Sequence, residues 1–399
     1  MFHAVVLSGQ ADVLERAPLL EALAQRCGQA GAMNWLSHIV NVSSFKRKKP
    51  YLVLMVREGA KRSALHLDDV HAAVFLFEYR IMGAPTGTFS ADDWAGFRTV
   101  IAPEAERGAV AALAADAMLE RGAHIVLVAY GDAGQAAAKL LPTSRHAMRW
   151  AWRTQPIAME LPLEDTMQAT LAKLGRSTRY NLGYYRRRLA REMPCEFVAD
   201  ARGMLQEDEL QAINARSLNP VSPGDFRRQY ESSCQLPGGF LLGLRTLGGK
   251  WISLVGGWRQ AGSTVHYWQM NTAGHEKLSI GKAMLSYFLE HEVSLRTKTL
   301  IYNGGTPNPI RFSFTPHDVT YLVVQSRSWR SRALNGITRM VNSFRSFVPI
   351  NSLLAQTMCS KDLVWHSPKL DGPMLAAQKQ QAAKAESEAT AIRRKIESA

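Results

Sequence analysis

Short apolar runs bounded by polar turns alternate with longer stretches of helical periodicity along this chain. Residues 1–35 are rich in Ala and Leu and predict one or two helices. Tyr51–Val56 and Ala73–Tyr79 predict strands, because β-branched and aromatic residues dominate both runs. Pro103–Arg121 predicts a helix, and His124–Tyr130 predicts a buried strand after it. This strand–helix–strand order indicates a parallel strand pair in an α/β layer.

A second unit of alternating helices and strands follows a connector at Pro142–Arg149. Helices are expected at Thr166–Arg191, Gly203–Leu218, Phe226–Cys234 and Ser279–Leu295, and strands at Gly239–Thr246, Lys250–Gln260, Thr264–Met270, Thr299–Tyr302 and Val319–Gln325. The turns Leu247–Gly249 and Gln260–Ser263 are typical of hairpins between antiparallel strands. The second unit therefore combines a hairpin sheet with a helix that leads to a further strand.

The C-terminal quarter differs in composition. Ser326–Ile350 carries five arginines, no acidic residue and an apolar stripe at helical spacing. That pattern fits a helix lying on a membrane surface, or one that packs on the preceding domain. Ala376–Ala399 has few large apolar residues and cannot form a core. We expect domains at 1–150, 151–326 and 327–375, and a polar tail at 376–399.

The composition is that of a globular protein of two domains. The chain has 399 residues, 46% of them hydrophobic, and its apolar runs are too short to span a bilayer. The start shows no signal peptide, and the four cysteines show no paired spacing, which fits a reducing compartment. The net charge of +14 favours phosphate-bearing partners, although a basic surface also serves solubility. We expect a cytoplasmic protein, with peripheral contact at the inner membrane face as one option.

The stretch His266–Ala283 shows the clearest chemical pattern. A strand runs out into a loop, and Ser279 is placed to cap the helix that follows. The first N–H groups of a helix have no internal partner and attract anions. We therefore expect a pyrophosphate cradle, in which the N–H groups of Lys282 and Ala283 act beside Gly281. The residues expected to bind this ligand are Ser279, Ile280, Gly281, Lys282 and Ala283. An ordinary capped helix has the same pattern.

From about Ile157 to Ser313 the chain resembles the second half of the BioF2-like, Fem-type acetyltransferases of the GNAT superfamily. Three passages carry the likeness: Ser177–Leu182, Leu278–Leu285, and Asn303–Gly305 with Arg311 and Phe312. The resemblance implies two GNAT-like domains, each a mixed sheet flanked by helices, with residues 1–150 as a degenerate first repeat. It also implies acyl-CoA, chiefly acetyl-CoA, as a co-substrate, with no permanently bound cofactor.

The chain departs from the family pattern at three places. Asn271 stands where the family usually has an acidic residue, Ile310 and Arg311 replace Tyr-Lys, and Ile280 replaces the proline before Gly281. These differences leave the acceptor open. Candidate acid–base groups on strands beside the cradle are His266, Tyr267 and Tyr302, each of which could instead be a packing residue. Candidate acceptor-binding residues are Arg179, Asn181, Asn303 and Arg311.

Other chemistry is disfavoured. The sequence has no P-loop, no dinucleotide-binding glycine pattern and no nucleophile elbow, and His66–His71 does not match a common metal-ligand spacing. Lys173–Arg191 carries seven basic residues and three tyrosines, which fits contact with an anionic substrate or RNA, or a solvated helix face. We therefore expect transfer of an acyl group to an amine or hydroxyl, with an envelope polysaccharide or lipid precursor as acceptor. The alternatives are an aminoacyl-tRNA-dependent transferase and a non-catalytic nucleic-acid or membrane binder.

Overall fold

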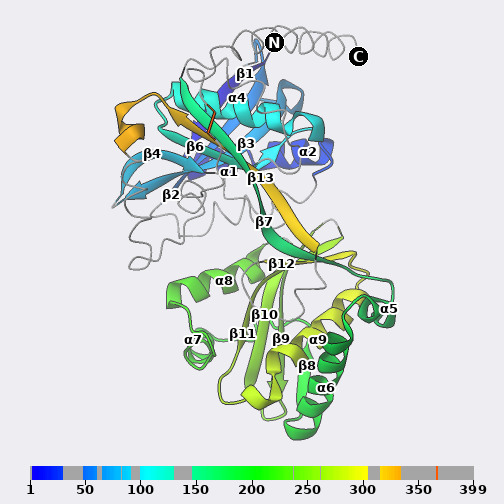
Figure 1. The fold of residues 1–399 in the computed structure, drawn as a ribbon. Coiled ribbons are helices and arrows are strands. Elements are labelled where there is room, and N and C mark those ends of the chain that lie inside the picture. Colours follow the sequence, from blue (N-terminus) through cyan, green and yellow to red (C-terminus); the bar gives the residue numbers. More distant parts are fainter. Residues whose placement is uncertain are drawn as a thin grey trace.

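A computed structural model describes residues 2–29, 48–60, 65–81, 83–90, 99–129, 146–236, 238–260, 262–303, 315–333 and 365–366. Figure 1 shows two lobes, one above the other, joined by two long antiparallel strands. These strands are β7 (Ala147–Pro162) and β13 (Thr315–Ser326). In the described part of the chain, no helix is long and apolar enough to cross a membrane.

The N-terminal lobe is a mixed sheet with helices packed on it. Its strands are β1 (Phe2–Ser8), β2 (Lys48–Arg57), β3 (Val70–Ile81), β4 (Ala84–Ser90), β5 (Val100–Ile101) and β6 (Ile125–Ala129). Its helices are α1 (Gln10–Glu15), α2 (Ala17–Arg26) and α4 (Arg107–Glu120), with 3₁₀ turns η2 (Leu67–Asp69) and η3 (Glu104–Glu106). The expected parallel pair exists, but it joins β6 to β4 and not to β3. The sequence did not predict β4.

The C-terminal lobe repeats this plan. Its helices are α5 (Met167–Ala172), α6 (Arg176–Glu192), α7 (Glu207–Ala215), α8 (Pro223–Gln235) and α9 (Ile280–Ser294), with the 3₁₀ turn η6 (Glu276–Leu278). Its strands are β8 (Cys195–Val198), β9 (Gly239–Thr246), β10 (Trp251–Gln260), β11 (Ser263–Asn271) and β12 (Thr299–Asn303). The predicted hairpins β9–β10 and β10–β11 are both antiparallel.

All of these strands belong to one continuous sheet among the described residues. Its order is β1-β2-β3-β4-β6-β13-β7-β12-β11-β10-β9-β8, with β5 beside β3. The two halves of this order match each other about the central pair β13 and β7. In this match β6 corresponds to β12 and β4 to β11. In each half a helix, α4 or α9, connects the two parallel strands. The chain therefore contains two copies of one α/β plan, as the tandem prediction requires.

The two long strands link the lobes. β7 pairs with β13 along most of its length, and its end pairs with β12 of the C-terminal lobe. β13 also pairs with β6, so the last described strand completes the N-terminal sheet. The boundary expected between residues 150 and 151 thus falls inside β7. Most of the segments expected at 327–375 and 376–399 lie outside the described residues.

Apolar packing stabilises both lobes. One cluster lies between the N-terminal sheet and α4, and another lies beneath α6 and α9, where Leu182, Leu189 and Phe288 are almost fully buried. A third cluster joins α1, α2, β2 and β3 to Trp258, Val265 and Ile301. The lobes therefore share buried surface as well as two strands.

Candidate functional site

The parallel pairing of β11 and β12 in the C-terminal lobe covers only the first part of β11. It runs from Ser263 with Thr299 to His266 with Tyr302, and β11 then continues to Asn271 without further pairing to β12. In α/β sheets, ligands bind beyond the carboxyl ends of parallel strands. α9 is the next α-helix after β11 and covers this part of the sheet. The carboxyl end of this parallel pair is therefore the place where the fold can admit a ligand.

A β-bulge begins where the pairing of β11 with β12 ends. Gly256 lies opposite Trp268 and Gly257 opposite His266, so Tyr267 is the extra residue on β11. Both glycines are required, because a Cβ on Gly257 would lie 1.9 Å from the Val265 carbonyl oxygen, and one on Gly256 would lie 2.4 Å from Trp268 Nε1. The bulge reverses the alternation of side chains, so that odd-numbered residues face α9 beyond it.

His266 is buried on the α9 side of the sheet. Its ring stacks on Tyr302, with centroids 4.0 Å apart, and lies 5.7 Å from the ring of Phe288. Burial lowers its pKa from the ordinary 6.5 to about 4. Gln269 is close enough to offset this shift in part, but neither ring nitrogen has a hydrogen-bond partner among the described residues. At neutral pH the imidazole is therefore uncharged, with one donor and one acceptor unused.

Tyr267 does not join this group. Its ring packs on Trp258, with centroids 5.1 Å apart, in the cluster that links the two lobes. Tyr302 lies beside His266 and packs against the cluster under α9. The structure thus brings together two of the three predicted catalytic side chains and places the third on the opposite face of the sheet.

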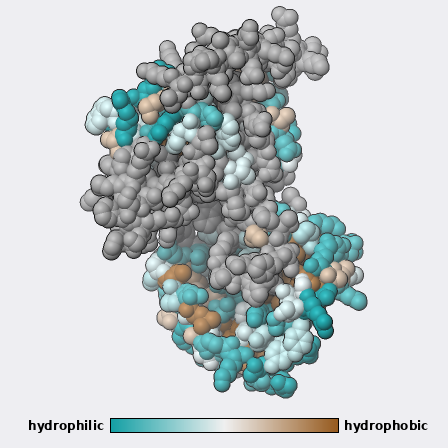
Figure 2. Space-filling model, viewed as in Figure 1, coloured by the Kyte–Doolittle hydropathy of each residue, from teal (hydrophilic) through white to brown (hydrophobic). Residues whose placement is uncertain are grey.

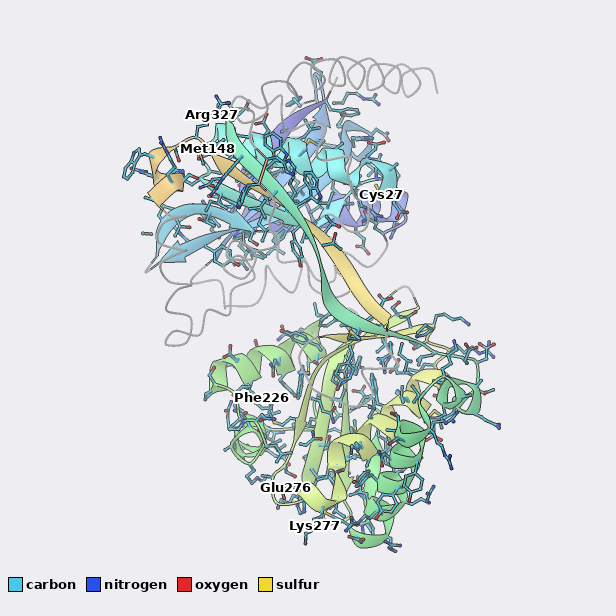
Figure 3. The ribbon with its side chains drawn as sticks, in the orientation of Figure 1. Cys27, Met148, Phe226, Glu276, Lys277 and Arg327 are labelled. Carbon is cyan, nitrogen blue, oxygen red and sulfur yellow. The ribbon has the colours of Figure 1, made fainter. Side chains whose placement is uncertain are left out.

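The start of α9 differs from the expected cap. Ser279 precedes the helix with φ 45°, a left-handed conformation that is unusual for a non-glycine residue, and its side chain makes no capping hydrogen bond. The N–H groups of Lys282 and Ala283 donate to the Ser279 carbonyl, so they are not the anion donors that the sequence suggested. Within the described residues, the N–H groups of Ile280 and Gly281 have no acceptor. Figure 3 labels Glu276 and Lys277 just before this point, at the lower end of the lobe.

A polar network lies beneath Gly281. A Cβ on Gly281 would lie 3.1 Å from Asn271 Nδ2 and 3.5 Å from Gln269 Nε2. Asn271 Oδ1 accepts hydrogen bonds from Ser253 Oγ at 2.8 Å and from Gln269 Nε2 at 3.1 Å. The glycine thus allows α9 to begin directly over these side chains. The sequence analysis did not name Ser253 or Gln269. Strict alternation along β11 would place Gln269 on the face of the sheet away from α9.

Some of the remaining predicted residues have defined positions in the structure. Lys282 lies over the ring of Tyr185 on α6, with Nζ 4.7 Å from the centroid. Arg179 donates to the Ala172 carbonyl and Asn181 to Ser177 Oγ, both on the exposed side of α6. These two residues are not assembled with His266.

Two of the predicted acceptor-binding residues are not described. The side chain of Asn303 and all of Arg311 lie outside the described residues. In the described part of the chain, no group of three or more His, Cys, Asp or Glu side chains could hold a metal ion.

The far end of α9 is fixed by a buried ionic network. Glu292 is fully buried and accepts hydrogen bonds from Arg259, from Thr264 at 2.5 Å and from Thr297 at 2.8 Å. This network connects α9 to the β10–β11 hairpin. It holds the helix in one position over the sheet and so sets where the helix start lies.

Comparison with known proteins reveals a likeness in fold alone. No protein-family model matches the sequence, and no curated protein matches it. Among solved structures, FemX has a TM-score of 0.50 at 8% identity, over 76% of this chain and 95% of that one. L-PGS from Bacillus licheniformis has a TM-score of 0.49 at 12% identity, over 81% and 96%. A tandem GNAT protein from the clavulanic acid biosynthesis pathway has 0.43 at 14%, over 82% and 99%.

The likeness to FemX extends over both lobes. The chain therefore has a FemX-like fold, with two units of one α/β plan in tandem. This confirms the fold that the sequence resemblance predicted. At such low identity the likeness assigns no substrate and no catalytic residue.

Proposed function

We propose that the protein is an acyltransferase that takes an acyl group, chiefly acetyl, from acyl-CoA and passes it to an amine or hydroxyl. The observation that carries this proposal is the coincidence of two features. The parallel pairing of β11 and β12 ends at His266 and Tyr302, and the glycine-bearing start of α9 lies over the continuation of β11. A long donor with a reactive thioester at one end and phosphates at the other suits such a site.

The phosphate end of the donor is assigned to the start of α9. The N–H groups of Ile280 and Gly281 are the donors, and the helix dipole favours an anion there. Ser279 and Lys282 flank these groups, and Ala283 closes the first turn. The left-handed backbone at Ser279 supports the assignment, since such conformations gather at ligand-binding sites.

The thioester end is assigned to His266 and Tyr302. Transfer forms a bond from the acceptor nitrogen or oxygen to the carbonyl carbon and breaks the carbon–sulfur bond. The acceptor loses a proton, and the leaving thiolate gains one. A pKa of about 4 makes His266 a poor base at neutral pH, so we assign its N–H to the carbonyl oxygen as charge develops there. Tyr302 is assigned as the proton donor to the thiolate.

For the acceptor we propose a chemical class and no individual compound. An amine or hydroxyl on an anionic envelope polysaccharide or lipid precursor fits the net charge of +14. Arg179, Asn181, Asn303 and Arg311 stay candidates for contacts to it.

A second candidate is an aminoacyl transferase that uses aminoacyl-tRNA. The buried His266 favours it, because neither ring nitrogen has a partner among the described residues. The amino group of an aminoacyl donor could hydrogen-bond to the neutral imidazole, whereas the methyl of an acetyl group could not. The basic helix α6 would suit the RNA.

Titration calorimetry tests these candidates together. Acetyl-CoA, a longer acyl-CoA, free CoA and a short aminoacylated RNA stem would each be titrated into the full chain. Binding of acetyl-CoA and of CoA supports the first candidate, and binding of the charged stem alone supports the second. If no donor binds, the chain is a non-catalytic binder on this scaffold and both enzymatic proposals fail.

A further inference from the structure

One face of α6 presents a line of basic and aromatic side chains. Arg176, Tyr180, Tyr184, Arg187 and Arg191 recur at helical spacing along this helix, and we call them the α6 stripe. Leu182 and Leu189, on the opposite face, are 2% and 0% exposed. The stripe covers 15 helical steps, or about 22 Å. It therefore faces solvent along nearly the whole helix.

The stripe is open to a partner. Tyr180 is 64% exposed, and its ring stacks on that of Tyr184 with centroids 5.8 Å apart. Within the described residues, no carboxylate forms a salt bridge with Arg176 or Arg187. Glu290 pairs with Arg186, and Glu192 pairs with Arg188 at 2.9 Å and with Arg191 at 3.3 Å. Arg176 and Arg187, which have no carboxylate partner among the described residues, favour a surface of negative charge.

An exposed leucine lies beside the end of the stripe. Leu247, in the turn between β9 and β10, is 78% exposed. The turn is rigid, because Thr246 exchanges backbone hydrogen bonds with Gly249 and Lys250. Thr246 pairs with Cys195, which follows α6 by three residues. The hairpin tip and the end of α6 therefore lie together, on the lobe whose other exposed surface in Figure 2 is mostly hydrophilic with scattered hydrophobic patches.

We propose that this face docks the C-terminal lobe on an anionic phospholipid bilayer. Arginine side chains bind lipid phosphates, tyrosines suit the headgroup region, and Leu247 reaches the acyl boundary. RNA would also attract the arginines, but it offers nothing to a leucine held out on a rigid turn. The proposal does not depend on acyl-CoA as the donor, because none of these residues is assigned to the acyl-CoA site.

Vesicle co-sedimentation of the full chain tests the proposal. We expect binding to vesicles with one quarter phosphatidylglycerol at about 0.1 M salt, loss of binding near 1 M, and little binding to pure phosphatidylcholine. The triple change Arg176→Gln, Arg187→Gln, Arg191→Gln should weaken binding on the order of 100-fold. Leu247→Ser should weaken it roughly tenfold.

Control variants distinguish vesicle binding by the α6 stripe and Leu247 from binding by the overall positive charge or by the basic segment after residue 326. Arg57→Gln, Arg121→Gln, Arg296→Gln removes the same charge elsewhere, and Leu113→Ser removes a leucine that is 50% exposed on the other lobe. Both controls should bind vesicles like the parent chain, and all variants should melt at the same temperature. Equal binding by the parent and the α6 triple variant overturns the proposal. The proposal is also overturned if the parent chain binds polyuridylate but not vesicles, and the triple change abolishes the binding to polyuridylate.

Discussion

His266 and Tyr302 lie opposite each other on the parallel strands β11 and β12, and their rings stack with centroids 4.0 Å apart. They are the last matched pair of these two strands, and the bulge at Tyr267 begins at the next residue. A buried polar ring, the end of the parallel pairing and a bulge thus meet at one point.

The stability of the fold should depend on the protonation of His266. Its pKa is about 4 in the folded chain and 6.5 when unfolded, so between these values the unfolded chain binds the extra proton. Stability should therefore be fully present above about pH 6.5, fall as the pH drops to 4, and level off below. The contribution is on the order of 3 kcal/mol. Urea unfolding at a series of pH values measures it.

A control variant isolates this residue. Burial also lowers the pKa of His124 and His291, so the whole chain will show a steeper slope than His266 alone. His266→Phe preserves a buried aromatic ring and removes the titrating group. The difference in the free energy of unfolding between parent and variant should be constant above about pH 6.5, change by on the order of 3 kcal/mol as the pH falls to about 4, and be constant again below that. A difference that stays constant from pH 4 to 7.5 would rule out the shifted pKa.

The buried Glu292 should be critical for folding. Glu292→Ala leaves Arg259, Thr264 and Thr297 without their shared acceptor, and should lower the free energy of unfolding by about 3–5 kcal/mol. Glu231→Ala removes an exposed pair with Arg227 and should cost less than about 1 kcal/mol. Thermal unfolding of both variants gives the comparison, and similar small losses would show that the network is not stabilising.

The bulge should not tolerate a side chain at Gly257. An added Cβ would lie 1.9 Å from the backbone oxygen of Val265, which cannot move without breaking the pairing of β10 and β11. Gly257→Ala should therefore yield little folded protein. Gly224→Ala is the matched control, because nothing lies within 4 Å of its Cβ position in α8, and it should be neutral or slightly stabilising. Circular dichroism and soluble yield separate the two; a well-folded Gly257→Ala contradicts the register.

Local patterns predicted the elements around the site well. The hairpins β9–β10–β11, the helix α9 and the strand β12 all lie where periodicity and turn residues place them. β1, β4, β7 and β8 were missed. The predicted connector Pro142–Arg149 covers only the start of β7, and the two ends of this strand pair with different lobes. Local sequence patterns do not show that one strand pairs with both lobes.

The site was predicted less completely, for a physical reason. Strict alternation along β11 places His266 and Gln269 on opposite faces, yet the bulge brings Gln269 and Asn271 to the α9 side. The adjacent glycines Gly256 and Gly257 were the available signal, since two glycines inside a strand often mark a bulge.

Gly281 provides the strongest test of the proposed donor site. Gly281→Val should weaken acyl-CoA binding on the order of 100-fold, because it obstructs the two free N–H groups. Lys282→Ala should cost less than about tenfold, since its charge already lies over Tyr185. The added side chain would also press on Asn271 Nδ2, so Asn271→Ala and the double variant are needed as controls.

The deciding measurement is calorimetry of acetyl-CoA binding to these four variants and the parent chain, with unfolding midpoints recorded alongside. We expect Gly281→Val to lose affinity for acetyl-CoA, and the double variant with Asn271→Ala to be folded and still to lose it. Lys282→Ala and Asn271→Ala alone should retain most of the affinity. If the folded double variant binds acetyl-CoA as tightly as the parent chain, the phosphates are held elsewhere, and the assignment of the donor site to the start of α9 is wrong.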